Sequence, residues 1–447
     1  MPSFSASPSP NPAVPNADFF DLKEIYQLQA QHWKQQAAYV NDHSLFYRRH
    51  LTNVTLNGNI DEIKDLPFTN KEMLRTDQRD NAPFGTYLAA DSKDIVRMHR
   101  TSGTTGTAMN LALTMQDAVM TAIVGGRAQR ASGLSPDHRV VHCLNYQLWM
   151  GGYTDHASLE ATGAMVIPYG VGATHGLIEL IQELKIDAIS CTPSYPGVLE
   201  QVIKSDFPGL SPRDLGLRLG LFGGEAGLDD PAFRARLEDT WGFEVRNSNY
   251  GVTDVLCNFA GQSLTNNDLH FIALDVLYPE LIDPETGTTR PWKEGESGEL
   301  VLTHLCKQAQ PLVRFRSGDI IVLTGTGKAE CGRTAPRFRV IGRSDDMVVV
   351  RGINVFPTMI AAVINQLDAL SGEYRIVLNE SPPYDRLPLE VELQTECSDV
   401  DSLCRQLQSM IKTQIGVSAN IKVLAPDTLP RTEGKTRRVI KQFESAV

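Results

Sequence analysis

The sequence lacks the features that mark secreted, membrane-spanning and nucleic-acid-binding proteins. Its seven cysteines are scattered and include no C-x-x-C pair, so we expect reduced thiols in a cytoplasmic protein rather than a disulfide framework. No apolar run approaches the roughly 20 residues that a membrane-spanning helix needs, and the first ten residues do not have the pattern of a signal peptide. The net charge of −11 argues against a general nucleic-acid binder.

The length and composition are those of a globular protein with two or three domains. The chain has 447 residues, of which 42% are hydrophobic. Residues 1–16 are rich in proline and serine, so we expect a disordered tail there. We expect a large N-terminal domain over 17–342 and a small C-terminal domain over 343–447. The sequence leaves the oligomeric state open, a homodimer included.

Short apolar runs alternate with helical patterns, which predicts an α/β fold. The rhythm of strand, helix and strand is typical of mostly parallel sheets with helices, and a β-rich part follows from about residue 300. Beyond it the pattern predicts a small α+β unit. Strands are expected over 139–144, 163–168, 188–191, 217–222, 374–378, 389–394 and 420–423, a β-ribbon over 342–350, and helices over 19–39, 176–184, 359–367 and 400–414.

One tight turn, Thr101-Ser102-Gly103-Thr104-Thr105-Gly106-Thr107, concentrates hydroxyl side chains and glycines. Glycines let the backbone N–H groups approach an anion and hydroxyls add donors, so this loop is suited to a polyphosphate. It lacks the Gly-Lys-Ser/Thr ending of a Walker A loop, and a Thr/Gly-rich hairpin turn is the alternative. We expect this loop and Gly223-Gly224-Glu225 at the carboxyl ends of parallel strands, where ligands bind.

Four later segments, taken in order with this loop, identify a family. They are Asn-Tyr-Gly-Val-Thr-Asp over 249–254, Arg-Phe-Arg-Ser-Gly-Asp-Ile over 314–320, Gly-Arg-Ser-Asp-Asp over 342–346 and Leu-Pro-Arg-Thr-Glu-Gly-Lys-Thr-Arg-Arg over 429–438. Their identity and order resemble the adenylate-forming superfamily of acyl-CoA synthetases, peptide-synthetase adenylation domains and luciferases, and phenylacetate–CoA ligases in particular. The resemblance runs from about residue 45 to the end and implies a mobile C-terminal domain.

The resemblance implies an ATP-dependent acid ligase that forms an acyl-adenylate and then a thioester with CoA. It implies ATP, Mg²⁺ and CoA as cofactors, and a small carboxylic acid, aromatic or arylacetic, as the substrate. Lys435 would bridge the acid and the α-phosphate, Arg343 would lie near the ribose or phosphates, and Asp345 would be the hinge. The implied nucleotide and CoA contacts are Thr101, Ser102, Gly103, Thr104, Thr105, Gly106, Gly224, Glu225, Asn249, Tyr250, Gly251, Thr253, Asp319, Arg343 and Gly352.

Within this set, two residues depart from the family pattern. The loop that commonly ends Gly-Lys ends here in Gly106-Thr107, and Asp254 stands where a glutamate usually helps to hold Mg²⁺. By resemblance, Tyr250 stacks on adenine and Asp319 accepts both ribose hydroxyls; the alternatives are a core tyrosine and a turn aspartate. For Asp254 the alternative is a helix cap.

The acid pocket is expected around residues 145–152. Tyr146, Trp149, Tyr195, Phe222 and Gly223 are its expected walls, although Trp149 can equally be a core residue. Because Tyr146 and its neighbours make the segment polar, an aromatic acid with a ring hydroxyl or amino group fits the pattern.

A zinc site is a weaker expectation. Some relatives hold zinc with cysteines and a histidine, and the remaining ligands here would be Cys257, His270 and Cys331. One cysteine of that pattern is lost, so we favour a degenerate site with buried cysteines.

Two other functions stay open at this stage. One is a biosynthetic adenylating enzyme that passes its product to a carrier protein or a non-thiol nucleophile, as nitrite-activating, diazo-forming relatives do. The other is a binding module with a degenerate site, against which the presence of Lys435, Asp319 and Arg343 argues.

Overall fold

The computed structural model describes residues 17–52, 54–101, 108–225, 227–396, 399–430 and 438–442. The tail predicted for residues 1–16 lies outside this part of the chain. Within the described part, no helix is both long enough and apolar enough to span a bilayer.

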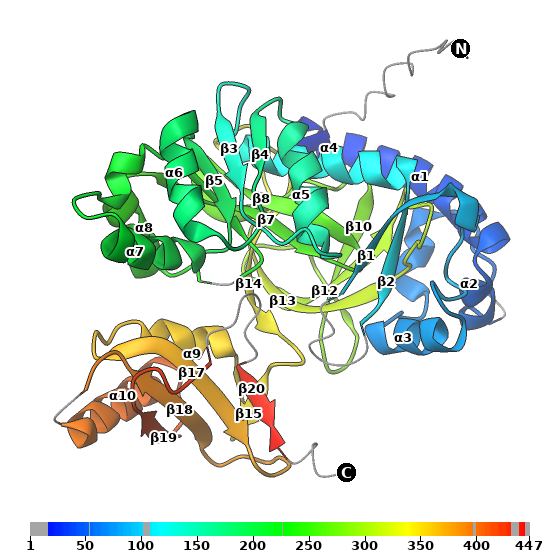
Figure 1. The fold of residues 1–447 in the computed structure, drawn as a ribbon. Helices are drawn as coiled ribbons and strands as arrows, with labels where there is room; N and C mark the ends of the chain where they lie inside the picture. Colours follow the sequence, from blue (N-terminus) through cyan, green and yellow to red (C-terminus); the bar gives the residue numbers. More distant parts are fainter. Residues whose placement is uncertain are drawn as a thin grey trace.

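Three helices cover one end of the large domain (Figure 1). α1 (Leu22–His43) begins at a capping box in which Asp21 and Glu24 satisfy each other's backbone N–H groups. It buries one stripe that includes Trp33 and Val40. The shorter helices are α2 (Leu45–His50) and α3 (Lys71–Asp80).

The large domain is built on one twelve-stranded sheet among the described residues, in the order β11-β10-β12-β13-β14-β9-β8-β7-β6-β5-β3-β4. Strands β3 to β7 pair in parallel, and the remaining strands pair antiparallel. The α/β fold is therefore confirmed, with one difference: the β-rich part continues the same hydrogen-bonded sheet. The parallel strands are β3 (Arg139–His142), β4 (Met165–Pro168), β5 (Ala188–Cys191), β6 (Leu219–Gly223) and β7 (Glu244–Val252).

Helices flank the parallel part, as expected for βαβ units (Figure 1). They are α4 (Met115–Ala131), α5 (Met150–Glu160), α6 (Thr174–Leu184), α7 (Tyr195–Asp206) and α8 (Pro231–Trp241). The antiparallel strands are β8 (Leu256–Ser263), β9 (Asn266–Phe271), β10 (Leu277–Ile282), β11 (Thr289–Arg290), β12 (Ser297–His304), β13 (Phe315–Gly325) and β14 (Arg337–Arg343).

A separate hairpin carries the glycine-rich loop. β1 (Ile95–Arg100) and β2 (Asn110–Thr114) pair antiparallel and form a sheet of their own. Our expectation that this loop follows a parallel strand is therefore wrong, because the loop joins two antiparallel strands. Gly223-Gly224-Glu225 does follow the parallel strand β6.

The small C-terminal domain has its own core. Its four-stranded sheet has the order β19-β18-β17-β20, and its buried residues form a cluster that runs from Val348 to Val439. A two-stranded ribbon, β15 and β16, precedes it, so the ribbon predicted over 342–350 is split between β14 and β15. The elements are β15 (Val348–Val350), β16 (Ile353–Val355), α9 (Pro357–Ile364), β17 (Leu370–Leu378), β18 (Leu387–Leu393), α10 (Val400–Gln414), β19 (Ala419–Leu424) and β20 (Val439–Lys441).

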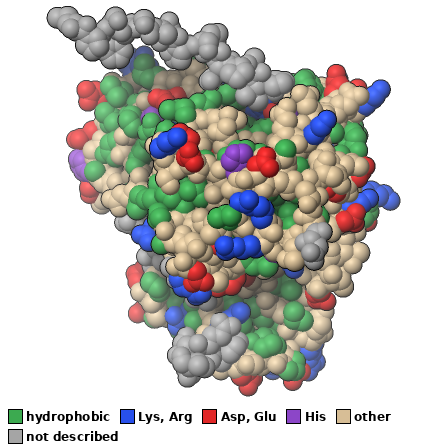
Figure 2. Space-filling model, turned by 90° about the vertical axis from the view of Figure 1, so that its right-hand side faces the viewer, with side chains coloured by type: hydrophobic (Ala, Val, Ile, Leu, Met, Phe, Trp, Pro, Cys, Tyr) green, Lys and Arg blue, Asp and Glu red, His purple; other side chains and the backbone are tan. Residues whose placement is uncertain are grey.

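The face of the molecule in Figure 2 carries charged side chains of both signs, interspersed with hydrophobic and neutral ones.

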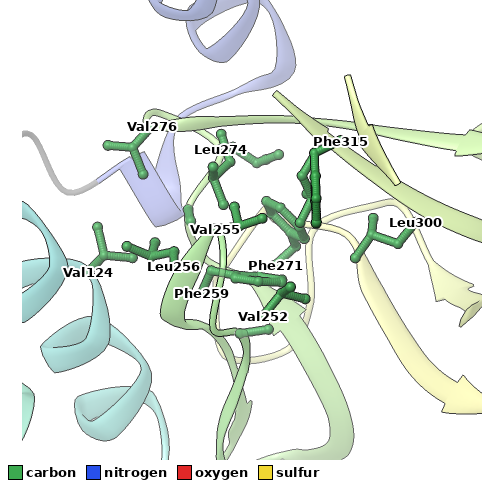
Figure 3. Close-up of a cluster of buried hydrophobic side chains, with 14 of the residues drawn as sticks. Val124, Val252, Val255, Leu256, Phe259, Phe271, Leu274, Val276, Leu300 and Phe315 are labelled. Atoms are coloured by element: carbon green, nitrogen blue, oxygen red, sulfur yellow. The ribbon is translucent and has the colours of Figure 1, made fainter. Parts of the chain in front are cut away.

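The main core of the large domain lies where the helices meet the antiparallel strands. Phe259 and Phe271 lie next to each other at its centre, with ring centroids 5.2 Å apart, and Leu256 and Val252 pack around them (Figure 3). Phe259 is fully buried. Its ring also lies edge-on to Tyr250, at 5.2 Å, so this core supports the strand that carries the 249–254 motif.

Replacing Phe259 by alanine should leave a large cavity in this core. We expect Phe259→Ala to lower the free energy of unfolding by about 3–5 kcal/mol. Urea unfolding followed by circular dichroism measures the change. Met115→Ala, at a side chain that is 61% exposed, is the control and should change stability little; an equal loss in both variants would contradict the packing described here.

Candidate active site

Asp319 is the centre of a three-residue cluster at the junction of the two domains. β13 and β14 pair antiparallel in a register that sets Asp319 opposite Arg343. Arg343 Nη1 lies 2.6 Å from one carboxylate oxygen of Asp319, and the Tyr250 hydroxyl donates to the other at 2.7 Å. Gly318, at φ +77°, leaves room for this arrangement, because a Cβ there would meet Arg343 Nη2 at 2.8 Å.

Arg343 also reaches the segment that leads into the C-terminal domain. Its Nε lies 2.8 Å from Asp345, whose side chain is 47% exposed. Burial alone would lower the pKa of the Arg343 guanidinium, but the carboxylates of Asp319 and Asp345 outweigh it and raise that pKa. Arg343 is therefore a permanent positive charge between two carboxylates.

Tyr250 is held by the core on one side and by Asp319 on the other. Its ring meets Phe259 and Phe338 edge-on, with centroids 5.2 and 5.4 Å away. Burial, and then the nearby Asp319 charge, raise the pKa of its hydroxyl, so the hydroxyl stays protonated and donates.

Asp254 lies at the turn between β7 and β8 and contacts a residue that the sequence analysis missed. Lys71, the first residue of α3, places its Nζ 2.7 Å from Asp254 Oδ2. Asp254 Oδ1 is buried and has no hydrogen-bond partner among the residues that the structure describes. No local signal could pair these residues, which lie 183 positions apart.

The glycines after β6 bring the 223–225 segment close to its neighbours. A Cβ at Gly223 would lie 2.7 Å from the backbone oxygen of Asn249, and a Cβ at Gly224 would lie 3.5 Å from the Trp149 ring. Glu225 accepts from the Ser194 backbone N–H at 3.3 Å, and burial raises the pKa of its carboxyl. This strand end therefore adjoins both the 249–254 motif and the segment expected to line the acid pocket.

The expected walls of the acid pocket fall into two groups. In the first group, Trp149 lies beside Gly224, and Tyr146 and Tyr195 are half-buried. The Tyr146 hydroxyl is hydrogen-bonded to His156 Nδ1 at 2.9 Å, and the Tyr195 hydroxyl to Thr174 Oγ1 at 3.3 Å. Phe222, by contrast, is fully buried in the core beneath the helices, where its ring packs on Phe243. We therefore remove Phe222 from the pocket wall: its side chain fills the core.

A buried carboxylic acid connects helix α5 to strands β7 and β8. Asp155, on α5, accepts hydrogen bonds from the Asn249 side-chain amide and from Cys257 Sγ, the latter at 3.1 Å. Burial raises the pKa of Asp155 to about 7, although both hydrogen bonds oppose the rise. The sequence analysis did not single out Asp155, because one aspartate in a helix carries no signal.

The three expected zinc ligands do not come together. Cys257 bonds Asp155, whereas Cys331 Sγ lies 3.9 Å from His270 Nε2. In the described ranges, no cluster of three or more His, Cys, Asp and Glu side chains could hold a metal ion.

Several expected contacts are peripheral or undescribed. Thr101 Oγ1 accepts from the Met109 backbone N–H at 2.9 Å, so its hydroxyl oxygen closes the hairpin base. Gly352 lies at φ +78° in the turn between β15 and β16. Gly251 packs against the backbone of Cys257, which leaves no room for a Cβ, and Thr253 begins the turn that carries Asp254. Ser102, Gly103, Thr104, Thr105, Gly106 and Lys435 lie outside the described residues.

Two family models match the chain. The model described as AMP-binding enzyme matches residues 44–305, and the one described as AMP-binding enzyme C-terminal domain matches residues 352–442. The chain is 35% identical to a phenylacetate-coenzyme A ligase of Pseudomonas putida, over 94% of each chain. It is 32% identical to one of Thermus thermophilus, over 95% of this chain and 98% of the relative.

Solved structures of a 2-hydroxyisobutyryl-CoA ligase are similar over the whole fold. Its postadenylation state, in complex with an acyl-AMP, has a TM-score of 0.86 at 27% identity and covers 100% of this chain and 96% of that one. Its thioesterification state has a TM-score of 0.69 at 28% identity, over 96% and 93%. The domain arrangement here is thus more similar to the postadenylation state.

The raised pKa of Asp155 predicts how pH affects stability. Because folding raises this pKa from 3.8 to about 7, the carboxyl stabilises the fold fully below pH 3.8, and this contribution is lost as the pH rises through about 7. Asp155→Asn, which mimics the protonated acid, should gain stability relative to the wild type as pH rises from 4 to 8.

The difference in melting temperature between wild type and variant, measured across this pH range, checks the prediction. Asp137→Asn, at an exposed aspartate, is the control and should show no such trend. A difference for Asp155→Asn that is constant from pH 4 to 8 would contradict a buried, perturbed carboxyl.

Proposed function

The chain belongs to the AMP-binding enzyme family and is an AMP-forming acid–CoA ligase, and on this premise we propose that its acid carries an aromatic ring. The observation that carries the proposal is Trp149, whose ring lies beside Gly224 at the carboxyl end of β6. The indole supplies an apolar aromatic face at this strand end, and aromatic rings pack favourably against such a face. The curated relatives are named for phenylacetate, which supports the same class.

The reaction has two steps. A carboxylate oxygen attacks the α-phosphorus of ATP, which forms the acyl-adenylate as the bond to pyrophosphate breaks. The CoA sulfur then attacks the acyl carbon and AMP leaves. Both steps need a site that holds the nucleotide while the acid and then the thiol reach it.

The Asp319 cluster is proposed to hold the nucleotide. Its carboxylate is pre-oriented by Arg343 and Tyr250, so its oxygens present lone pairs without further ordering. Tyr250 and Gly224 are proposed to flank the adenine, and Arg343 to stay near the ribose and phosphates. A fixed cation there stabilises negative charge that develops during adenylation.

Asp254 is proposed to hold Mg²⁺. Its buried, unpartnered Oδ1 is the kind of hard oxygen donor that this ion takes, together with phosphate oxygens and waters. When bound, the ion would neutralise charge on the phosphates. We do not propose zinc for Cys257, His270 and Cys331, because these side chains are not gathered.

The acid is proposed to lie between Trp149, Tyr146, Tyr195 and the 223–224 backbone. The polar contact of the Tyr146 hydroxyl with His156 supports an acid with a hydroxyl or amino substituent. CoA is the proposed acceptor, with Gly352 beside its pantetheine arm, because the curated relatives are CoA ligases; this does not favour a carrier protein or nitrite. ATP and CoA are both cytoplasmic metabolites, so we propose the cytoplasm as the location.

Incubation with ATP, Mg²⁺, CoA and a panel of acids tests the reaction and its substrate. We expect AMP, pyrophosphate and an acyl-CoA with phenylacetate and with hydroxy- or amino-substituted aromatic acids, resolved by chromatography. Acetate and 2-hydroxyisobutyrate are the aliphatic controls. ADP as the product would refute the ligase mechanism, and turnover with the aliphatic acids alone would refute the aromatic pocket.

We propose that the two steps take place in two different arrangements of the domains. Lys435 acts in the first step, and Asp345 is the hinge about which the C-terminal domain moves before the second. Lys435→Ala should slow adenylate formation about a hundredfold or more, because it removes a charge from the transition state. Thioester formation from a supplied acyl-adenylate should stay within a few-fold of wild type. Single-turnover measurements of each half-reaction check this, and Asp345→Pro, which restricts the hinge, should show the opposite pattern. Equal losses in both steps for Lys435→Ala would exclude this division.

A further inference from the structure

Lys71 and Asp254 form an ion pair whose two members differ in exposure. The Asp254 side chain is only 5% exposed, whereas the Lys71 side chain is 34% exposed. The ammonium group, 2.7 Å from Oδ2, thus joins a buried carboxylate to a side chain that solvent and ligands can reach. The other carboxylate oxygen, Oδ1, has no hydrogen-bond partner within the described part of the chain.

The backbone that carries Lys71 is fixed to the strand that carries Asp319. Thr69 donates its N–H to the Arg314 carbonyl at 3.0 Å and accepts from the Arg316 N–H at 2.9 Å, next to the start of β13. Asn70 then caps α3 through the Met73 N–H. The lysine therefore enters the site from a rigid position.

The remaining charges of the site make this lysine important. Arg343 is already held by the carboxylates of Asp319 and Asp345. The glycine-rich loop over 101–107 has neither lysine nor arginine in its sequence. A polyphosphate bound beside Asp254 would therefore meet the Lys71 ammonium group, which lies 2.7 Å from Asp254 Oδ2.

We propose that Lys71 is a nucleotide-binding residue that contacts the terminal phosphates of ATP and positions Asp254. The ammonium group donates to Oδ2, so Oδ1 remains available to the metal ion. Mg²⁺ prefers one or two carboxylates together with phosphate oxygens. A compact ammonium can bridge a carboxylate and a phosphate at once. The proposal rests on the proposed function, because it assigns Lys71 to the same ATP site.

The test compares a ligand that has terminal phosphates with one that lacks them. Isothermal titration calorimetry with Mg²⁺ measures the binding of α,β-methylene-ATP and of AMP to the full chain. Lys71→Met should weaken binding of the ATP analogue about tenfold, as expected for the loss of one hydrogen bond between charged groups, and leave AMP binding unchanged. Lys71→Arg, which keeps the charge, should restore most of the affinity.

Lys64→Met removes the same charge from an exposed lysine seven positions earlier and is the matched control; it should bind both ligands as the wild type does. Melting temperatures show which variants are folded, and Lys71→Gln is the second variant if Lys71→Met is not. A folded Lys71→Met or Lys71→Gln variant that binds the analogue as tightly as the wild type, or that loses analogue and AMP equally, would overturn the proposal and leave a structural ion pair. Failure of the wild type to bind nucleotide or to form AMP would instead refute the proposed function.

Discussion

The antiparallel register of β13 and β14 is the constraint on which the site depends. It sets Asp319 opposite Arg343, and Arg343 in turn reaches Asp345 at the start of the link to the C-terminal domain. A shift by one residue would turn each of these side chains to the other face of the sheet. Gly318 makes room for the contact between Arg343 and Asp319, because a Cβ there would lie 2.8 Å from Arg343 Nη2 and displace the guanidinium. The proposed nucleotide contact and the connection to the C-terminal domain are thereby tied to one pair of strands.

Much of the fold could be predicted from the sequence because its elements are locally encoded. The βαβ rhythm predicts β3 to β6, and the apolar periodicity predicts α10 with both of its ends. The continuous sheet could not be predicted in this way. Whether β8 extends β7 or begins a separate layer depends on pairing between strands, and pairing leaves no trace in the periodicity of either strand.

The residues of the candidate site also fall into those that local sequence marks and those that only the fold brings together. Residues inside contiguous motifs, such as Tyr250, Asp319 and Arg343, could be named because their neighbours mark them. Lys71 and Asp155 could not, since each acts through a partner far away in the chain. Phe222 is the opposite case, a residue that its sequence neighbours mark but that lies outside the site. It precedes Gly223-Gly224 in the sequence. Adjacent residues on a strand face opposite sides of the sheet, and the Phe222 side chain is buried in the core.

The strand β7 lies at the seam where the parallel half of the sheet meets the antiparallel half. Two adjacent residues on it look in opposite directions, with Asn249 joined to Asp155 of α5 and Tyr250 joined to Asp319 of β13. The side proposed to meet the acid and the side proposed to meet the nucleotide are thus separated by the thickness of one strand. In evolutionary terms, such a partition lets mutations diversify the choice of acid while selection preserves the handling of ATP.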